Sequence, residues 1–259
     1  GRCALGNAST TGNDNIAIGY GAADALTSGH TNVAIGCNAM TSNQSGIENV
    51  AIGLGAMRDT SGSGHYNVAI GKYALGQADT SGNNNVAIGN AAADEVTTGA
   101  CNVAIGTGAL SGATTGCENV AIGTNALGVG VVGGTSSQGL YNVAIGISAG
   151  QSATTAVDNI FIGRAAGDSL TTGATNIAIG LNALGSQTTG GTNNVAIGSG
   201  AYGASVNDGS NGIAIGTGAL GAGDVSGAHN IAMGYRSGYD LNTGAHNVFL
   251  GYHSGYDAN

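Results

Sequence analysis

Apolar and polar positions recur along this chain with a period of 17 or 18 residues. Each repeat centres on the pattern Asn-(Val/Ile)-Ala-Ile-Gly, from Asn15–Gly19 to the variant at Asn247–Gly251. The pattern occurs fourteen times, and one spacing, between Gly123 and Gly146, is longer at 23 residues. Because the repeat extends through the whole chain, residues 1–259 are interpreted as a single repeat-array domain.

Both ends of the sequence fall inside a repeat. Cys3–Gly6 aligns with Tyr73–Gly76, and Ser254–Asp257 aligns with Ser237–Asp240. We therefore expect the domain to be truncated mid-repeat at both ends, as a segment of a longer array.

The core of each repeat predicts a short β-strand. The residue after Asn is Val or Ile in every repeat, and the residue two further on is almost always Ile. Side chains two apart on a strand share a face, and β-branched residues favour strands. Pairs such as Val33 with Ile35, or Val103 with Ile105, are therefore expected to form a buried stripe.

The residue between each β-branched pair is Ala in twelve repeats, and it is Phe161 or Phe249 in the other two. This column is expected on the opposite, outer face, where an apolar strip needs cover. The cover could come from another chain, or from a second strand of the same chain. Segments such as Gly106–Leu110 predict such a second strand.

Turns are expected before each strand. Gly stands three residues before the core Asn in thirteen repeats, after Ser- and Thr-rich stretches, and it suits a turn with positive φ. The core Asn, replaced only by Gly212, can form a hydrogen-bonded ladder along the array. The predicted structural ladder is represented by Asn32, Val33, Ile35, Gly36, Asn102, Val103, Ile105 and Gly106.

A coil of about 17 residues without an apolar period of 3.6 excludes helical repeats, and it is too short for a propeller blade. The sequence therefore predicts an all-β fold, a parallel β-solenoid of about 14 coils of 17–18 residues. Each coil is expected to carry two short strands and to stack on the next.

The segment Asn102–Leu110, NVAIGTGAL, resembles the YadA-like head repeat of trimeric autotransporter adhesins, and similar arrays occur in bacteriophage tail fibres. The resemblance covers nearly the whole chain. It implies a left-handed β-roll, a side-by-side homotrimer and a role in attachment to surfaces. The coil here is longer than in most such adhesins, which favours the tail-fibre versions. This segment contains no coiled-coil neck, stalk or membrane anchor.

Composition narrows the function classes. The chain has 51 Gly but no Pro and no every-third-residue period, which excludes collagen, and its net charge of −9 disfavours nucleic acid and anionic lipid as partners. No apolar run is long enough for membrane insertion in this segment. No cofactor motif or nucleophile setting is found, so an enzyme is not expected.

Two pairs of side chains are weak candidates for chemistry. His229 and His246 occupy adjacent coils in the variable column just before the core Asn, which is expected to face solvent. They could share a metal ion, or they could be bystanders. Cys101 and Cys117 also lie on neighbouring coils and could be free thiols or a disulfide.

The one long repeat places its extra residues in the connection 127–139. Insertions in solenoids map to loops and often to a binding face, although a tolerated insertion is the favoured interpretation. The candidate binding residues are Val129, Val131, Val132, Thr135, Ser136 and Gln138.

Together these features predict a non-enzymatic attachment protein, a rigid segment of a phage tail fibre or bacterial surface adhesin. Its expected location is extracellular, on a virion or a bacterial cell surface. Its expected partners are two further copies of itself and a cell-surface receptor, for example a glycan. A structural fibre spacer without ligand and an ice-binding solenoid are the alternatives.

Overall fold

The computed structural model describes residues 1–6, 10–60, 64–128, 139–186, 191–203, 209–223 and 225–258. The chain divides into two compact units, one built on Gly1–Asn125 and one on Ser137–Asn259 with the short segment Ala126–Val131. The described residues form three-residue strands and no helix. The strands are β1 (Ile16–Ile18), β2 (Val33–Ile35), β3 (Val50–Ile52), β4 (Val68–Ile70), β5 (Val86–Ile88), β6 (Val103–Ile105), β7 (Val120–Ile122), β8 (Val143–Ile145), β9 (Ile160–Ile162), β10 (Ile177–Ile179), β11 (Val195–Ile197), β12 (Ile213–Ile215), β13 (Ile231–Met233) and β14 (Val248–Leu250).

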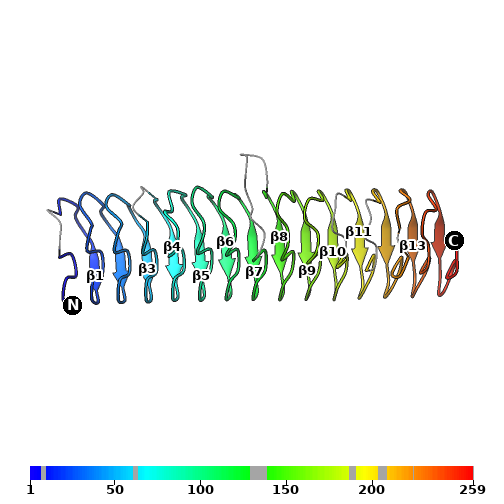
Figure 1. Cartoon of the computed structure of the whole chain (residues 1–259), viewed down its shortest axis with the longest axis horizontal. Coiled ribbons are helices and arrows are strands. Elements are labelled where there is room, and N and C mark those ends of the chain that lie inside the picture. The colour runs from blue at the N-terminus through cyan, green and yellow to red at the C-terminus, as the bar shows by residue number, and fades with distance from the viewer. Residues whose placement is uncertain are drawn as a thin grey trace. The chain divides into compact units, whose positions relative to one another are not determined.

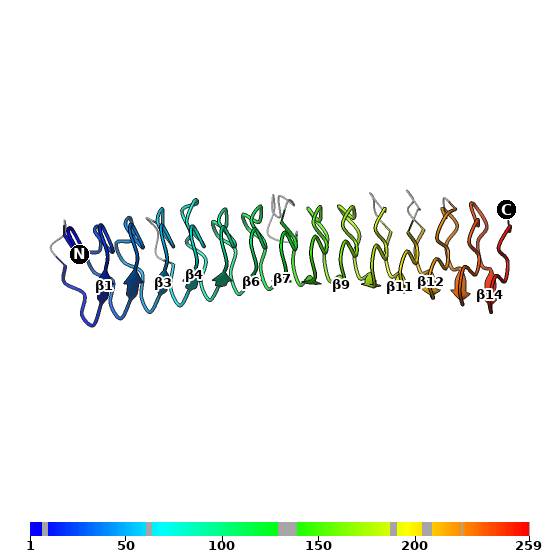
Figure 2. The same cartoon turned by 90° about the horizontal axis from the view of Figure 1, so that it is seen from below.

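Each unit is a parallel β-solenoid. In the first unit β1–β7 pair in chain order, and in the second unit β8–β14 do the same (Figure 1). Equivalent residues are paired throughout, as Val33 is with Val50 and Ala34 with Ala51. Within each unit the strands follow one another along the same side of successive coils (Figure 2). The predicted stacked solenoid is therefore confirmed.

The assignment of the two strand faces was wrong. Ala34 and Ala104 in the middle of their strands are completely buried, whereas Val33 and Ile35 are only partly buried. The Ala face points into the coil, and the β-branched face points outward. A coil of this length has a narrow interior, where a methyl group fits and a Val or Ile side chain does not.

The inner face of each strand packs against the segment that follows it. Ala39 and Met40 are both fully buried, and equivalent small and large apolar residues fill the other coils. Phe161 replaces the inner Ala in β9, where the facing positions are Gly150 and Gly167. A Cβ at these glycines would lie 2.6 and 2.3 Å from the Phe161 ring. The large side chain stands in the column of Phe161 and is missing from the column of Gly150 and Gly167, so the filled volume of the interior is conserved.

The predicted second strand is also wrong. Residues such as Gly108 and Leu110 have φ of 63° and 54°, so the backbone of Gly106–Leu110 turns instead of extending. Coils still hydrogen-bond to one another here, for example from Met40 N to Ala56 O at 2.9 Å. This turning segment covers the inner Ala column, so that column needs no partner chain.

The asparagine ladder is confirmed. Asn49 N donates to Asn32 Oδ1 at 2.9 Å, and Asn32 Nδ2 donates to Gly46 O at 2.7 Å. Asn102 repeats both contacts with Asn119 N and Gly116 O. Each buried side-chain amide therefore satisfies backbone groups of the next coil, which would otherwise be buried without partners.

The glycine three residues before the core Asn serves a different purpose from the one expected. Of the described glycines in this column, only Gly139 lies in the left-handed region. A Cβ at Gly29 would lie 2.4 Å from Gly46 O, so the column is glycine because adjacent coils touch there. The left-handed conformation belongs instead to the residue just before the Asn, such as Thr31 with φ 59°.

The glycine that closes each core motif is required both for its positive φ and for its close contact with the next coil. Gly36 and Gly106 have φ of 137° and 134°, a region that L side chains rarely adopt. A Cβ at Gly36 would also lie 2.4 Å from Gly53 O. The last residue of the motif is therefore fixed both by backbone conformation and by contact with the next coil.

Candidate interaction surfaces

The outward side of the strands forms an apolar surface that we call the strand face. It consists of the first and third residues of each strand, with the residue after the closing glycine beside them. Ile88 and Ile105 remain 36% exposed although strands lie on both sides of them. The exposed large apolar residues of this face are Ile16, Ile18, Tyr20, Leu54, Ile88, Ile105, Ile145, Ile147, Ile160, Ile162, Leu181, Ile197, Met233, Tyr235, Val248, Leu250 and Tyr252.

Few charges interrupt the strand face. The strands carry no charged residue, and the column beside them contains only Lys72 and Arg164. Val33, Ile35, Val103 and Ile105 of the predicted ladder therefore lie on an outward apolar surface, whereas their neighbouring Asn and Gly residues lie within the stack. Within each unit, an apolar strip of this kind favours association with another surface.

The variable column before the core Asn is exposed in every coil, as predicted. Its acids, Asp14, Glu48, Glu118 and Asp158, are separated by at least one coil without an acid. The scatter avoids stacked like charges and brings no two of these carboxylates into neighbouring coils.

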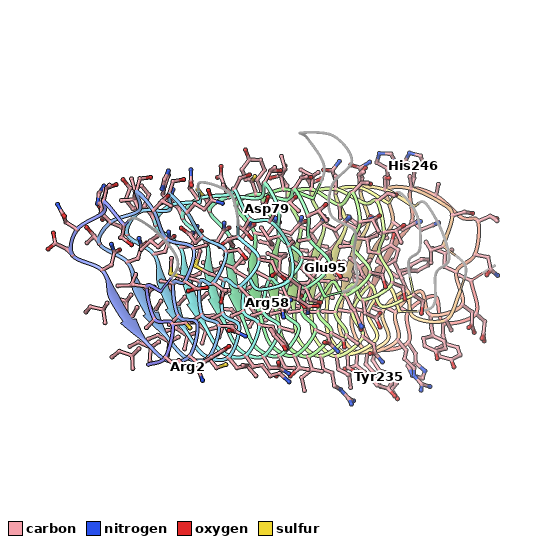
Figure 3. The ribbon with its side chains drawn as sticks, turned by 60° about the vertical axis from the view of Figure 1, so that its left-hand side comes forward. Arg2, Arg58, Asp79, Glu95, Tyr235 and His246 are labelled. Carbon is pink, nitrogen blue, oxygen red and sulfur yellow. The ribbon has the colours of Figure 1, made fainter. Side chains whose placement is uncertain are left out.

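The structure brings His229 and His246 together. Their rings stack with centroids 4.9 Å apart and an interplanar angle of 9°. Figure 3 shows His246 at the edge opposite Tyr235. Lone pairs of imidazole nitrogens lie in the ring plane, so two parallel rings do not converge on one metal position. Among the described residues no cluster of three or more His, Cys, Asp or Glu side chains could hold a metal ion.

The cysteines are free thiols in this structure. Cys101 is exposed and Cys117 is half-buried, and the Cys117 Sγ accepts a hydrogen bond from Ala100 N at 3.3 Å. Cys3 and Cys37 are also exposed and free. The six candidate residues of the 127–139 connection, Val129, Val131, Val132, Thr135, Ser136 and Gln138, lie outside the described residues.

Threonine hydroxyls at the turns are used to join coils. Thr27 Oγ1 donates to Gln44 O at 2.9 Å, Thr97 Oγ1 to Thr114 O at 2.8 Å, and Thr154 Oγ1 to Thr171 O at 3.0 Å. Each hydroxyl reaches the backbone of the following coil. These threonines therefore contribute hydrogen bonds to the stacking of the coils.

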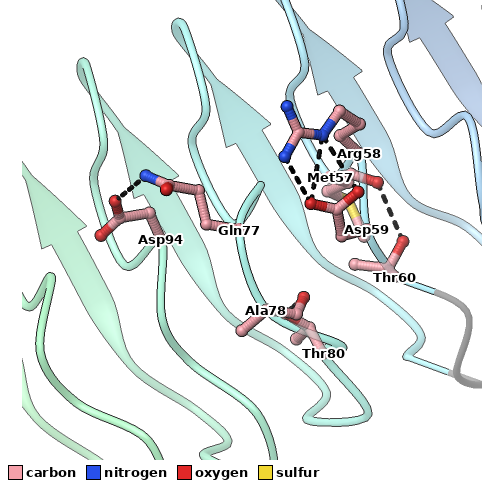
Figure 4. Close-up of polar contacts among 8 residues, drawn as sticks. All are labelled: Met57, Arg58, Asp59, Thr60, Gln77, Ala78, Thr80 and Asp94. Carbon is pink, nitrogen blue, oxygen red and sulfur yellow. Dashed lines mark hydrogen bonds and ion pairs between the residues drawn. The ribbon is translucent and has the colours of Figure 1, made fainter.

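Polar contacts at the turns of the first unit occur both within a coil and between neighbouring coils (Figure 4). Gln77 Nε2 donates to Asp94 Oδ2 at 2.5 Å, and Arg58 forms an ion pair with Asp59. Asp94 is only 7% exposed, and burial raises the pKa of its carboxyl to about 6. Its Oδ1 has no hydrogen-bond partner among the described residues. This carboxyl is therefore a buried group whose charged form is disfavoured in the folded chain.

A cleft in the second unit was missed from the sequence. It holds about 300 Å³ and is lined by Gly200 and Gly218 on one side and by Tyr235, Arg236 and Tyr239 on the other. The available signal was the occurrence of glycine at positions two and five after the closing glycine in two successive repeats. That signal has meaning only once the coils are known to stack in register.

No helix within the described ranges has the length and apolar character needed to cross a membrane. Comparisons of this chain with protein-family models, with curated proteins and with solved structures gave no match.

Proposed function

We propose that this chain is a non-enzymatic attachment protein that works as a side-by-side homotrimer of left-handed β-solenoids. The observation that carries the proposal is the strand face. Ile88, Ile105 and Ile197 expose apolar surface in an isolated chain, on one side of a regular parallel ladder. Covering this face by two further copies removes apolar area from water at about 25 cal/mol per Å².

The geometry supports self-association over an unrelated partner. Equivalent residues repeat along the ladder, so two copies aligned side by side present the same apolar columns to each other at the same coil spacing. Three such chains cover one another's first and third strand residues, and they leave free the variable column before the Asn and the column after the closing glycine. A trimer then presents three copies of every exposed residue at fixed spacing, which strengthens weak binding through multivalency.

The left-handed sense and the location outside the cell, on a tail fibre or a bacterial surface, follow from the resemblance of the NVAIG repeats to adhesin heads and tail fibres. The extensive Asn ladder and the coil-to-coil backbone hydrogen bonds hold successive coils together within each unit, which suits that location. The receptor is proposed to be a cell-surface molecule.

Light scattering of the purified chain tests the assembly. The proposal requires a mass near three times 24.7 kDa. Ile35→Lys places a charge on the strand face and is expected to give monomers with an unchanged circular dichroism spectrum. Thr31→Lys, four residues earlier in the exposed column, is the matched control and is expected to remain trimeric.

Binding of fluorescently labelled protein to a panel of intact bacterial cells tests the attachment role. Saturable binding by the trimer supports the proposal. A trimer that binds no cell surface contradicts attachment and favours the structural spacer. A monomeric wild-type chain contradicts the trimer, and thermal hysteresis measured on the same sample would then indicate ice binding.

A further inference from the structure

The second unit contains a cleft that is created by missing side chains. The coils of β11 and β12 carry Gly200, Gly203, Gly218 and Gly221 at the second and fifth positions after their closing glycines. The neighbouring coils carry Asn182 and Arg236 at the second position, and at the fifth position the β13 coil carries Tyr239 whereas the β10 coil carries Gly185. The four glycines therefore leave a recess of about 300 Å³ between better-filled coils.

One wall of the cleft holds an arginine between two tyrosines. The Arg236 guanidinium carbon lies 5.4 Å from the centroid of the Tyr235 ring and 5.0 Å from that of Tyr239. Both rings are themselves stacked, on Tyr252 at 5.4 Å and on Tyr256 at 5.1 Å. Cation–π contacts of this kind hold the guanidinium in place, and its N–H groups point outward in the plane of the guanidinium.

Arg236 has no ion-pair partner among the described residues, in which the single ion pair is Arg58–Asp59. It is also the single charged residue that lines this cleft. The chain carries a net charge of −9 with only five Lys and Arg in total. A positively charged cleft in such a chain is a local exception, and a fixed guanidinium favours bidentate binding of a carboxylate.

The remaining lining is small and polar. Asn182 supplies an amide, and Ser199 and Thr217 supply hydroxyls, and no described residue hydrogen-bonds to these three side chains. A second cleft of about 300 Å³, which contains Asp168, shares Asn182 and Gly203 with the first. The first cleft, which we call the groove, therefore offers hydrogen-bond donors and acceptors beside Arg236.

We propose that this groove binds an oligosaccharide that carries a carboxylate. The carboxylate pairs with Arg236, the sugar hydroxyls hydrogen-bond to Asn182, Ser199 and Thr217, and the apolar face of a sugar ring lies against the Tyr235 or Tyr239 side chain. A peptide would bring backbone groups that need a partner edge, and the cleft supplies none. The inference rests on the proposed attachment function and names the class of receptor.

The test measures binding by isothermal titration and saturation-transfer NMR on the assembled wild-type protein. The acidic probes are 3′-sialyllactose and trigalacturonic acid, and the neutral probes are lactose and maltotriose. At least one acidic probe is expected to bind at least ten times more tightly than its neutral counterpart. Raising the salt concentration is expected to weaken this binding, since the contact is an ion pair at a partly open site.

Variants separate this site from the rest of the surface. Arg236→Gln is expected to reduce affinity for the acidic probe at least tenfold, and Arg236→Lys is expected to restore only part of it. Arg164→Gln, which removes an exposed arginine outside the cleft, is the matched control and is expected to bind like the wild type.

A blocking variant tests the recess itself. Gly200→Asn adds a side chain where a Cβ meets no atom within 4 Å, and Asn182 occupies the same column with φ 52°, close to the 63° of Gly200. The Gly200→Asn variant is expected to fold and to lose binding of the acidic probe, whereas Gly21→Asn in the first unit is expected to retain that binding. The proposal is overturned if neither acidic probe binds, or if Arg236→Gln or Gly200→Asn binds like the wild type. A trimeric mass and cell binding that persist in those variants leave the attachment function standing.

Discussion

The hydroxyl of Tyr202 occupies the place that an asparagine side chain fills in other coils. A Cβ at Gly212 would lie 2.1 Å from Tyr202 Oη, and Gly212 is the single position where the Asn column is interrupted. Tyr202 itself stands in a column that is Leu in many coils, and it is completely buried. The two exceptions therefore compensate for each other, because the longer ring uses the space that the glycine leaves.

This relationship predicts strong coupling between the two sites. Gly212→Asn alone forces the new side chain onto the tyrosine, and Tyr202→Leu alone leaves a cavity, so each is expected to lower the free energy of unfolding by about 2–4 kcal/mol. The double variant restores the common pair and is expected to exceed both single variants in stability. Chemical denaturation measures all four proteins. Additive losses in the double variant would contradict the compensation.

The Asn ladder is expected to contribute strongly to stability. Asn102→Ala leaves Asn119 N without its acceptor, which lies 3.0 Å away, and Gly116 O without its donor at 2.8 Å. Because these groups are buried, we expect a loss of at least about 2 kcal/mol. Asn13→Ala, at an exposed position, is the control and should change thermal stability little. Equal melting temperatures for the two variants would show that the ladder is not needed.

Stability should depend on pH through Asp94. Burial raises its pKa in the folded chain to about 6 from the ordinary 3.8, so folding disfavours the charged form. The Asp94 contribution is therefore most favourable below about pH 3.8, declines as the pH rises towards 6, and is constant above that. Asp94→Asn is expected to flatten this part of the pH profile and to stabilise the protein at pH 7 by about 1–2 kcal/mol.

Urea denaturation between pH 4 and pH 7 measures the Asp94 effect. Asp14→Asn, at an exposed position, is the control and should keep the wild-type profile in this range. A profile for Asp94→Asn that coincides with the wild type would contradict a raised pKa at this carboxyl.

Backbone strain before the core Asn offers a route to stabilisation. Thr31 is exposed and β-branched, and it adopts φ of 59°, which is unfavourable for such a residue. Thr31→Gly is expected to stabilise the chain by about 0.5–1 kcal/mol, after the entropy of the more flexible unfolded chain is subtracted. Thr31→Ala retains a Cβ and should gain less. Differential scanning calorimetry compares the three melting temperatures, and a lower value for Thr31→Gly would count against strain at this site.

The sequence was sufficient for the parallel solenoid and for the ladder of residues such as Asn32 and Asn102, because both depend only on the repeat. It was insufficient for the strand faces. A period of two separates Ala34 from Val33 and Ile35 but does not tell which side is inside when both are apolar. Hydrophobicity favoured the larger residues, whereas the narrow coil interior selects the smaller one.

The cleft at Arg236 could not be predicted for a related reason. It depends on side chains that are absent from two neighbouring coils, so no single repeat contains it. Gly200 and Gly218 look like ordinary turn glycines when each repeat is considered alone. Only the stacking of the coils shows that they adjoin the stacked Tyr235 and Arg236.

The exceptions within the core also bear on how the chain finds its correct pairing while it folds. Nearly identical strands allow one coil to be skipped, with most ladder contacts still formed around a looped-out repeat. The Phe161 ring lies between Gly150 and Gly167, the Phe249 ring between Gly238 and Gly255, and the Tyr202 ring against Gly212. A pairing that skips one coil would place an aromatic ring against a column already filled by side chains, or would leave a cavity opposite a glycine. These few irregular residues therefore favour the correct register of the coils, and they direct a nearly uniform repeat sequence to a single native state.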